Sequence, residues 1–185
     1  MDEKNRIQEE WLVLRCQLGE SDAYKALLTL MEKRLFYFIR RLVATEADAL
    51  DVLQEVWLTV FRKISKLRDS KAFRSWIYRI AHDLAITVIR KEIHQEKLQG
   101  SYGEAILSND ERPFPELEDS AHVHRALDKL NSVHREVLTL FFLEDMSYEE
   151  IGHVIGCHVG TVKSRMHYAK KELRRLLEDK DDIHK

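Results

Sequence analysis

The segment IGCHVGTVKSRMHYAKKELRRLL, residues 155–177, holds the side chains best suited to bind nucleic acid. From His158 to Leu177 it carries six lysines and arginines and one glutamate, a net charge of +5. Long cationic side chains reach phosphates, and serine, histidine and lysine can reach base edges in the major groove. The segment therefore predicts a DNA-binding helix, with a solvated charged helix as the plain alternative.

The pair Cys157–His158 also raises the question of a metal site, since His153 lies about one helical turn before it. Structural zinc needs four ligands, and the sequence offers no fourth ligand beside these three. Cys157 also falls in the expected turn between two helices. We therefore expect a small buried thiol here, with no metal site and no cofactor.

A helix-turn-helix explains this region better than an isolated charged helix does. Ser147 and Glu150 form an S-x-x-E capping box, which satisfies the first unpaired amides of a helix. Gly156 permits a left-handed turn, and Gly160 and Thr161 then open the next helix. Two short helices joined by a glycine-containing turn are the arrangement that places the second helix in the major groove.

The second of these helices has two different faces. Its apolar residues recur at spacings of four and three, so we expect them to pack inward. They are Val162, Met166, Ala169, Leu173 and Leu176. The residues expected to contact DNA lie at the helix start and along its polar side: Thr161, Lys163, Ser164, Arg165, His167, Tyr168 and Lys171.

The composition favours a soluble protein made of long helices. The 185 residues include only six glycines and two prolines, and the net charge is −2. No apolar run approaches the roughly 18 residues that span a bilayer, and the N-terminus has no apolar signal core. The two cysteines lie far apart, as expected for free thiols in a reducing compartment. We therefore expect a cytoplasmic protein that does not insert into membranes.

A linker is predicted at residues 99–120. Both prolines and two of the glycines fall between residues 99 and 119, where helical periodicity is lost. Residues 104–119 carry six acids and one arginine, a net charge of −5. Such a segment is typical of a flexible connection between two helical domains.

Four helices are predicted before this linker. The apolar positions of the first are Ile7, Trp11, Leu14 and Leu18. Those of the third are Leu50, Leu53, Trp57, Val60, Phe61 and Ile64. Ser21, Thr45 and Ser70 are the expected N-caps of the second, third and fourth helices. The fourth is followed by the linker, after which four more helices are predicted near residues 121–130, 133–143, 148–155 and 159–178.

Two blocks of this sequence resemble one protein family. DALDVLQEVWLTVFRKI and FRSWIYRIAHDLAITVIRK resemble region 2 of the extracytoplasmic-function (ECF) sigma factors of bacterial RNA polymerase. MSYEEIG and VGTVKSRM resemble region 4 of the same group. The resemblance implies an all-α fold of two small helical domains. Region 2 would occupy residues 1–98 and region 4 residues 121–180, with the linker at 99–120.

The resemblance also gives a role to the basic segment at residues 62–97, which has a net charge of +6 and interleaved aromatic residues. Cations beside aromatic rings suit single-stranded DNA. The family melts the minus-ten promoter element here, and the loop equivalent to residues 67–71 holds a flipped base. The implied DNA contacts are Leu67, Arg68, Lys71, Arg74, Trp76, Arg79, Asp83, Arg90 and Lys91. Phe73 and Trp76 also lie on an apolar stripe, so we expect them to be mainly core.

The implied partners are promoter DNA, core RNA polymerase and an anti-sigma factor. On the polymerase, the family contacts the clamp helices of the largest subunit and the flap region. The polar side chains expected to dock on the clamp are Asp48, Asp51, Gln54 and Glu55. The chain departs from common family patterns at Asp83, where many relatives have asparagine, at Leu67 and at Tyr168. These departures bear on which promoter sequence is read.

The functional hypothesis is therefore a sigma factor that recognises minus-ten and minus-thirty-five elements and is not an enzyme. A stand-alone helix-turn-helix regulator is the alternative, but it leaves the N-terminal helices without a role. An enzyme is disfavoured, because the nine histidines are scattered and neither a P-loop nor a nucleophile elbow occurs.

Overall fold

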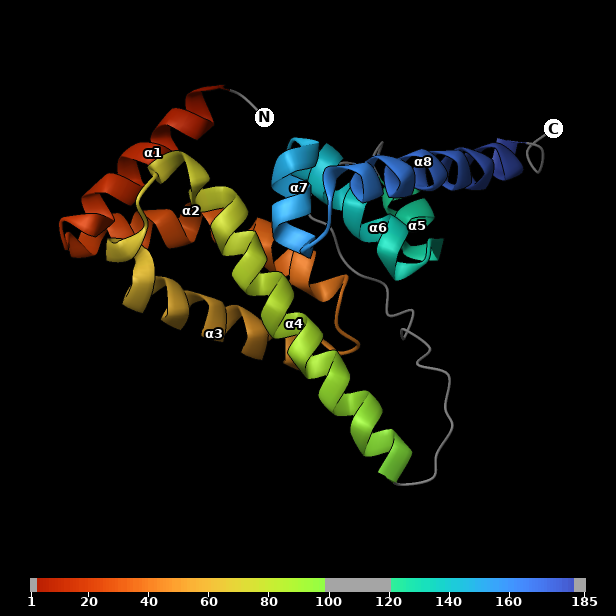
Figure 1. Cartoon of the computed structure of the whole chain (residues 1–185), viewed down its shortest axis with the longest axis horizontal. Coiled ribbons are helices and arrows are strands. Elements are labelled where there is room, and N and C mark those ends of the chain that lie inside the picture. Colours follow the sequence, from red (N-terminus) through yellow and green to blue (C-terminus); the bar gives the residue numbers. More distant parts are fainter. Residues whose placement is uncertain (1–2, 99–120, 182–185) are drawn as a thin grey trace. The chain divides into compact units, whose positions relative to one another are not determined.

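The computed structural model describes residues 3–98 and 121–181, and every regular element within them is helical (Figure 1). The predicted all-α fold class is therefore confirmed for the described chain. The expected linker, residues 99–120, lies outside the described residues. The helices separate into two compact units, the first containing α1 to α4 and the second α5, α6, α8 and most of α7.

The first unit is a bundle of four helices with two short 3₁₀ turns before the last. Its elements are α1 (Glu3–Gln17), α2 (Ser21–Arg40), α3 (Glu46–Lys63), η1 (Ile64–Lys66), η2 (Ser70–Ala72) and α4 (Phe73–Leu98). Helix α2 lies against α1, α3 and α4, and its Leu27, Leu35 and Ile39 are fully buried. The ring of Phe38 meets the edge of Tyr78 from α4, with centroids 5.1 Å apart. Tyr78 therefore belongs to the core.

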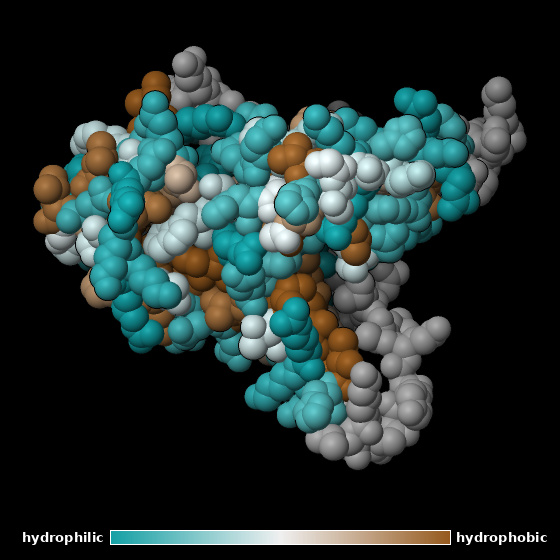
Figure 2. Space-filling view, in the orientation of Figure 1, coloured by the Kyte–Doolittle hydropathy of each residue, from teal (hydrophilic) through white to brown (hydrophobic). Residues whose placement is uncertain are grey.

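Helix α1 packs with a different face from the one predicted. Ile7, Trp11, Leu14 and Leu18 are 63, 55, 50 and 79% exposed, whereas Leu12, Val13 and Cys16 are buried. Figure 2 shows apolar residues at the surface where α1 lies. The helix has two apolar strips, and its polar Glu9 and Gln17 decide which one faces inward. Gln17 binds the segment between α3 and α4, and Glu9 binds Arg74 at the start of α4, as described below.

The helix starts agree with the sequence at one predicted N-cap and differ at two. Thr45 caps α3 as predicted, because its hydroxyl oxygen accepts a hydrogen bond from the Asp48 amide at 3.1 Å. Ser21 is instead the first residue of α2, and the N-cap is Glu20. Asp69, one residue before Ser70, caps η2 by accepting from the Lys71 amide at 2.9 Å. The 3₁₀ turn then delays the start of α4 to Phe73.

The second unit contains four helices and one π-helical turn. Its elements are α5 (Ala121–Lys129), α6 (Ser132–Leu138), η4 (Thr139–Leu143), α7 (Tyr148–Ile155) and α8 (Val159–Asp181). Arg135 of α6 is 3% exposed and closes the end of α5. Its guanidinium donates to the carbonyls of Leu127 at 3.1 Å, Asp128 at 3.1 Å and Leu130 at 2.8 Å. One buried cation thus donates to three carbonyls at the end of α5, where a helix runs out of amide donors.

Replacing Arg135 with lysine keeps the charge but removes the planar fork that reaches several carbonyls at once. We expect Arg135→Lys to lower the free energy of unfolding of the second unit by about 2–3 kcal/mol. Far-ultraviolet circular dichroism of the full chain measures this change. Tryptophan fluorescence is the internal control, because Trp11, Trp57 and Trp76 all lie in the first unit. The exposed Arg174→Lys is the matched variant, and equal melting curves for the two substitutions would contradict the role of Arg135.

Candidate nucleic-acid interface

The turn between α7 and α8 has the geometry predicted from its residues. The hydroxyl of Ser147 accepts from the Glu150 amide at 3.2 Å, and the Glu150 carboxylate accepts from the Ser147 amide at 2.7 Å. Gly156 ends α7 in the left-handed conformation, with φ of 68°. The capping box and the glycine turn are therefore both confirmed.

Gly152 is a structural requirement of this turn that the sequence reasoning missed. A Cβ atom at this position would lie 2.8 Å from the carbonyl oxygen of Cys157, closer than real contacts allow. The Cys157 amide also donates to the Gly152 carbonyl at 3.0 Å. The chain thus returns closely over α7, and only glycine leaves room for it. The available signal was the first glycine in EEIGHVIG, four residues before the turn glycine Gly156.

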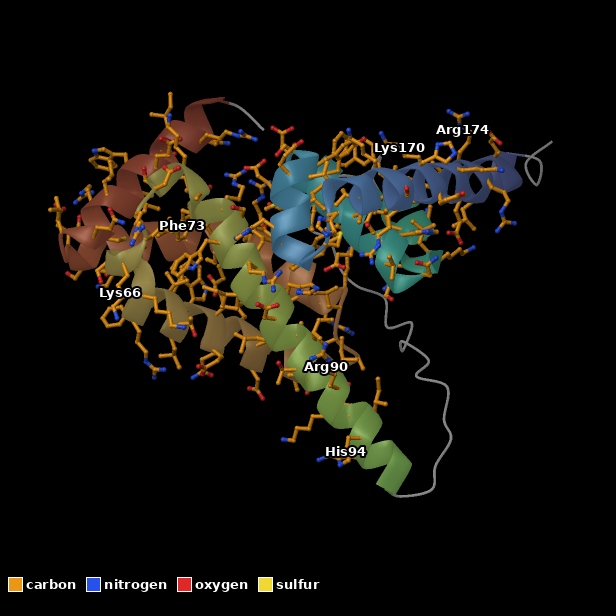
Figure 3. All side chains as sticks on the ribbon, viewed as in Figure 1. Lys66, Phe73, Arg90, His94, Lys170 and Arg174 are labelled. Atoms are coloured by element: carbon orange, nitrogen blue, oxygen red, sulfur yellow. The ribbon has the colours of Figure 1, made fainter. Side chains whose placement is uncertain are left out.

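Helix α8 presents the expected two faces. Val162, Met166 and Ala169 are buried, and Leu173 and Leu176 are half-buried. Six of the seven predicted DNA contacts are exposed: Thr161, Lys163, Ser164, His167, Tyr168 and Lys171. Figure 3 shows Lys170 and Arg174 also projecting from this helix. The exposed side of α8 is therefore a continuous polar and basic surface.

Three of these exposed residues make local contacts that orient them. The Ser164 hydroxyl donates to the Gly160 carbonyl at 3.1 Å, which leaves its lone pairs to accept from a base. The ring of Tyr168 lies edge-on to that of His167, with centroids 5.4 Å apart. Lys170 instead turns toward η4, where its ammonium lies 4.8 Å from the centre of the Phe141 ring.

The single acid of the basic segment does not oppose the cations on the exposed face. Glu172 accepts from the ring of His134 on α6, with 2.6 Å between its Oε2 and the histidine Nδ1. The amide of His134 in turn donates to the side chain of Asn131, the N-cap of α6, at 2.9 Å. This contact fixes α8 against α6 and directs the one negative charge toward the protein.

The seventh predicted contact, Arg165, is half-buried. It lies close enough to Glu136 of α6 for the positive guanidinium to lower the pKa of that carboxyl. Burial has the larger effect and raises the pKa of Glu136 to about 7, since one of its oxygens is shielded from solvent. Arg165 thus differs from the other six residues, because its charge faces the interior as well as the surface.

The alternative metal site at Cys157 and His158 gains no support from the geometry. Within residues 3–98 and 121–181, no three histidine, cysteine or acidic side chains gather closely enough to hold a metal ion. Cys157 is a half-buried free thiol in the turn.

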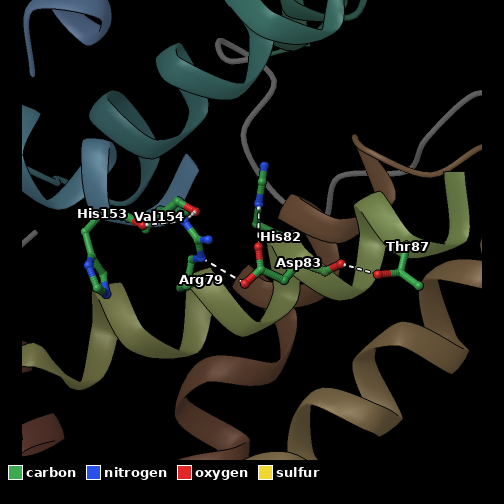
Figure 4. A network of polar contacts seen from close by, with 6 residues as sticks. All are labelled: Arg79, His82, Asp83, Thr87, His153 and Val154. Atoms are coloured by element: carbon green, nitrogen blue, oxygen red, sulfur yellow. Dashed lines mark hydrogen bonds and ion pairs between the residues drawn. The ribbon is translucent and has the colours of Figure 1, made fainter. Parts of the chain in front are cut away.

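In the first unit, four predicted DNA contacts share one side of α4. Trp76, Arg79, Asp83 and Arg90 follow one another at spacings of three, four and seven, which correspond to whole helical turns. The guanidinium of Arg79 donates to the Asp83 carboxylate at 2.8 Å, and the Thr87 hydroxyl donates to the Asp83 backbone carbonyl at 2.7 Å (Figure 4). Asp83 is therefore already engaged by a cation on its own helix.

His82 borders this face but carries a different electrostatic character. Its Nδ1 lies 3.3 Å from the Asp83 carboxylate. Burial nevertheless lowers the pKa of His82 below its usual value, and the positive charges of Arg79 and Arg90 lower it further. The positive charge that balances Asp83 at neutral pH therefore comes from Arg79.

The loop before α4 carries the remaining predicted contacts of this unit. Arg68 and Lys71 are exposed, and Leu67 is half-buried. At the far end of α4, Arg90 and Lys91 are exposed, and Arg90 projects from the helix in Figure 3. Arg74 is placed differently from the prediction. It is 5% exposed and forms a buried ion pair with Glu9 of α1, so its guanidinium does not reach the surface.

Helix α3 exposes the polar side chains expected to contact polymerase. Asp51, Gln54 and Glu55 are exposed, whereas Asp48 is half-buried and accepts a hydrogen bond from the Thr45 hydroxyl. Three large apolar residues are exposed beside them: Leu50, Leu58 and Phe61, at 51, 40 and 66%. Leu50 and Phe61 were predicted to be core. The buried arc of α3 instead turns toward Val52 and Val56, which moves both of these residues to its edge.

Two family models match the chain. Sigma-70 region 2 matches residues 27–93, and Sigma-70 region 4 matches residues 121–173. The RNA polymerase sigma-H factor of Pseudomonas aeruginosa is 30% identical over 182 residues, covering 92% of this chain and 94% of the relative. The ECF RNA polymerase sigma-E factor of Escherichia coli K12 is 28% identical, covering 91% and 93%.

Solved structures show the same likeness. The sigma factor RpoE of Bartonella quintana, crystallised with the anti-sigma factor NepR, matches with a TM-score of 0.68 and 27% identity. That match covers 84% of this chain and 96% of the RpoE chain. CnrH, in complex with the cytosolic domain of CnrY, shares the fold with a TM-score of 0.64 and 21% identity. In the described part of the chain, no helix has the length and apolar character needed to cross a membrane.

The raised pKa of Glu136 predicts a pH dependence of stability in the second unit. The unfolded chain ionises near the usual glutamate value, whereas the folded chain holds the proton until about pH 7. Stability is therefore greatest below the unfolded pKa and falls as pH rises toward 7. Glu136→Gln removes this loss, so the variant should match the parent at about pH 4, below the unfolded pKa, and exceed it at about pH 7.5.

Hydrogen exchange of α6 and α8 in the full chain measures this difference at the two pH values. The exposed Glu149→Gln is the matched control, since it removes one carboxylate from the surface of the same unit. An unchanged slope of stability against pH in Glu136→Gln would contradict the assignment.

Proposed function

We propose how this chain, which belongs to the ECF sigma factors of RNA polymerase, divides the reading of a promoter between its two units. The protein is an RNA polymerase sigma factor: it binds core polymerase and directs promoter-specific initiation of transcription. Sigma factors are initiation factors, and we assign no catalytic group to this chain. Region 2 occupies residues 1–98, region 4 occupies residues 121–180, and residues 99–120 link them.

In our proposal, α8 enters the major groove of the minus-thirty-five element. The observation that carries this assignment is the exposed basic side of α8 between residues 158 and 177, from which Glu172, the single acid of that segment, is turned away. Lys163, Ser164 and His167 reach base edges, while Thr161, Tyr168 and Lys171 contact the backbone. Arg165, half-buried beside Glu136, mainly holds α8 in place.

The first unit takes the melted minus-ten element. Arg68 and Lys71 bind phosphates, and the loop that contains Leu67 receives a base flipped from the non-template strand. Trp76, Arg79, Asp83, Arg90 and Lys91 extend this surface along α4. Asp83 is an acceptor for a cytosine amino group, with Arg79 fixing its carboxylate at 2.8 Å. We leave Arg74 out of this surface because its charge is buried against Glu9.

Core polymerase docks on α3. Asp51, Gln54 and Glu55 meet the clamp helices of the largest subunit, and Asp48 contributes by hydrogen bonding to Thr45, the N-cap of the helix. The exposed Leu58 lies among these polar residues in helical projection, so the contact has an apolar part. The second unit contacts the flap region. An anti-sigma partner is supported by the RpoE relative, which was crystallised with NepR.

The role of α8 is tested by the double substitution Lys163→Ala and His167→Ala. Loss of base-edge contacts, each worth about 1–3 kcal/mol, should lower transcription from the cognate promoter at least about tenfold. In vitro transcription with core polymerase on a genomic DNA library first identifies that promoter. Lys170→Ala is the control on the same helix, since Lys170 turns toward Phe141.

Core binding by the double variant must stay normal for the result to concern DNA. Undiminished transcription would remove the assignment of this face. Tight, specific binding of duplex promoter by the parent protein without polymerase would instead support a stand-alone regulator.

The docking face is tested by reversing two charges, Asp51→Lys and Glu55→Lys. Both side chains are exposed, so the fold tolerates the change, while the clamp now meets like charge. We expect affinity for core polymerase to fall about tenfold or more. Fluorescence titration of labelled protein with core enzyme gives the affinity. Glu32→Lys with Glu149→Lys makes the same change of charge at other exposed positions, and equal losses in both double variants would refute a specific face.

A further inference from the structure

The connection between α3 and α4 is held by helix α1 near both ends of the connection. Near the first end, the side-chain amide of Gln17 donates to the backbone carbonyl of Ile64 at 3.1 Å and to that of Leu67 at 2.7 Å. Near the second end, the carboxylate of Glu9 pairs with Arg74, and both side chains are 6% exposed. The three contacts link positions 47 to 65 residues apart in sequence.

The two ends of this connection have different local support. The Leu67 amide donates to the Ile64 carbonyl at 3.1 Å within η1, and Asp69 caps η2 through the Lys71 amide at 2.9 Å. Each of these bonds lies within one 3₁₀ turn, so neither fixes η1 relative to η2. The Gln17 amide donates one proton to the carbonyl of Ile64, the first residue of η1, and the other to the carbonyl of Leu67, which directly follows η1. It therefore sets the direction in which the chain leaves η1 at Leu67.

This position matters because of where the loop's side chains lie. Arg68 and Lys71 are exposed on either side of Asp69. The side chain of Leu67 is half-buried, and its backbone carbonyl accepts from the Gln17 amide. A loop that receives a flipped base binds it more tightly when its backbone is already held in the receiving conformation. A tether from a neighbouring helix provides such support without touching DNA.

We propose that Gln17 is a positioning residue for strand opening: its two hydrogen bonds hold the loop at residues 67–71 in the conformation that receives the flipped base. Glu9 fixes the other end through Arg74. The inference rests on the proposed function of this loop. It assigns to α1 a part in promoter opening through the protein backbone, separate from any contact of α1 with DNA.

The test uses holoenzyme, formed with core polymerase, and a labelled single-stranded oligonucleotide of the non-template minus-ten region. Each base is replaced in turn by an abasic site, and the loss of affinity at the captured base is the readout. Stacking of one base predicts a loss of about fivefold or more for the parent protein. In Gln17→Leu and Gln17→Glu, which lack the two donors, we expect this abasic penalty to fall below about twofold.

Two further variants separate positioning from general damage. Gln8→Leu makes the same change at an exposed position of α1 and should keep the full penalty. Gln17→Lys retains N–H donors that can reach the carbonyls and should restore most of it. Tryptophan fluorescence of each variant reports folding of the first unit, and core binding reports the docking face.

The outcomes distinguish the inference from the function on which it rests. A full abasic penalty in folded Gln17→Leu or Gln17→Glu would overturn the role of Gln17 while leaving the loop's role intact. If the parent protein showed no abasic penalty at any position, the proposed base capture itself would fail, and this inference with it. A lost penalty in Gln17→Leu that Gln17→Lys restores supports the proposal.

Discussion

A buried arginine keeps its charge, so its guanidinium must find acceptors inside the protein, and both units contain such arginines. In the first unit, Arg74 pairs with Glu9, which ties the start of α4 to α1. In the second, Arg135 reaches three carbonyls at the end of α5. Removing either partner would leave a buried charge unmatched. The packing of α1 in the one unit and of α5 in the other therefore depends on these cations.

The same requirement divides the basic residues into those paired with groups of the protein and those available to DNA. The net charge of −2 hides two basic segments, yet not all of their cations are available to DNA. Arg74 is withdrawn into the core, and Arg79 is shared with Asp83. On residues 158–177 of α8 the effect is opposite, because Glu172 turns toward His134 and leaves the exposed side of this segment basic or uncharged. Counting charges along the sequence thus overstates the positive surface of α4 and understates that of α8.

The sequence alone was enough to predict those features for which local bonding or helical periodicity allows only one arrangement. The capping box at Ser147 and the left-handed Gly156 followed from local bonding, and the inward stripe of α8 followed from its period. Helix α1 offered two apolar strips, and hydrophobicity alone could not choose between them, because the choice depends on distant partners of Glu9 and Gln17. Arg74 was misplaced for the same reason. Residue type predicts what a side chain can bind, whereas its partner is fixed only by the fold.

The two proposed DNA-binding faces would explain why neither unit needs to bind DNA tightly by itself. Helix α8 presents few cations to phosphates, and each phosphate contact contributes a modest, salt-dependent affinity. Stand-alone helix-turn-helix proteins double this surface by dimerising on two half-sites. Here the second DNA-binding surface is chemically different from the first. The loop at residues 67–71 and α4 carry aromatic and basic groups suited to unpaired bases. Once polymerase holds the chain, binding of one element raises the effective concentration of the other, so two weak contacts yield selective binding.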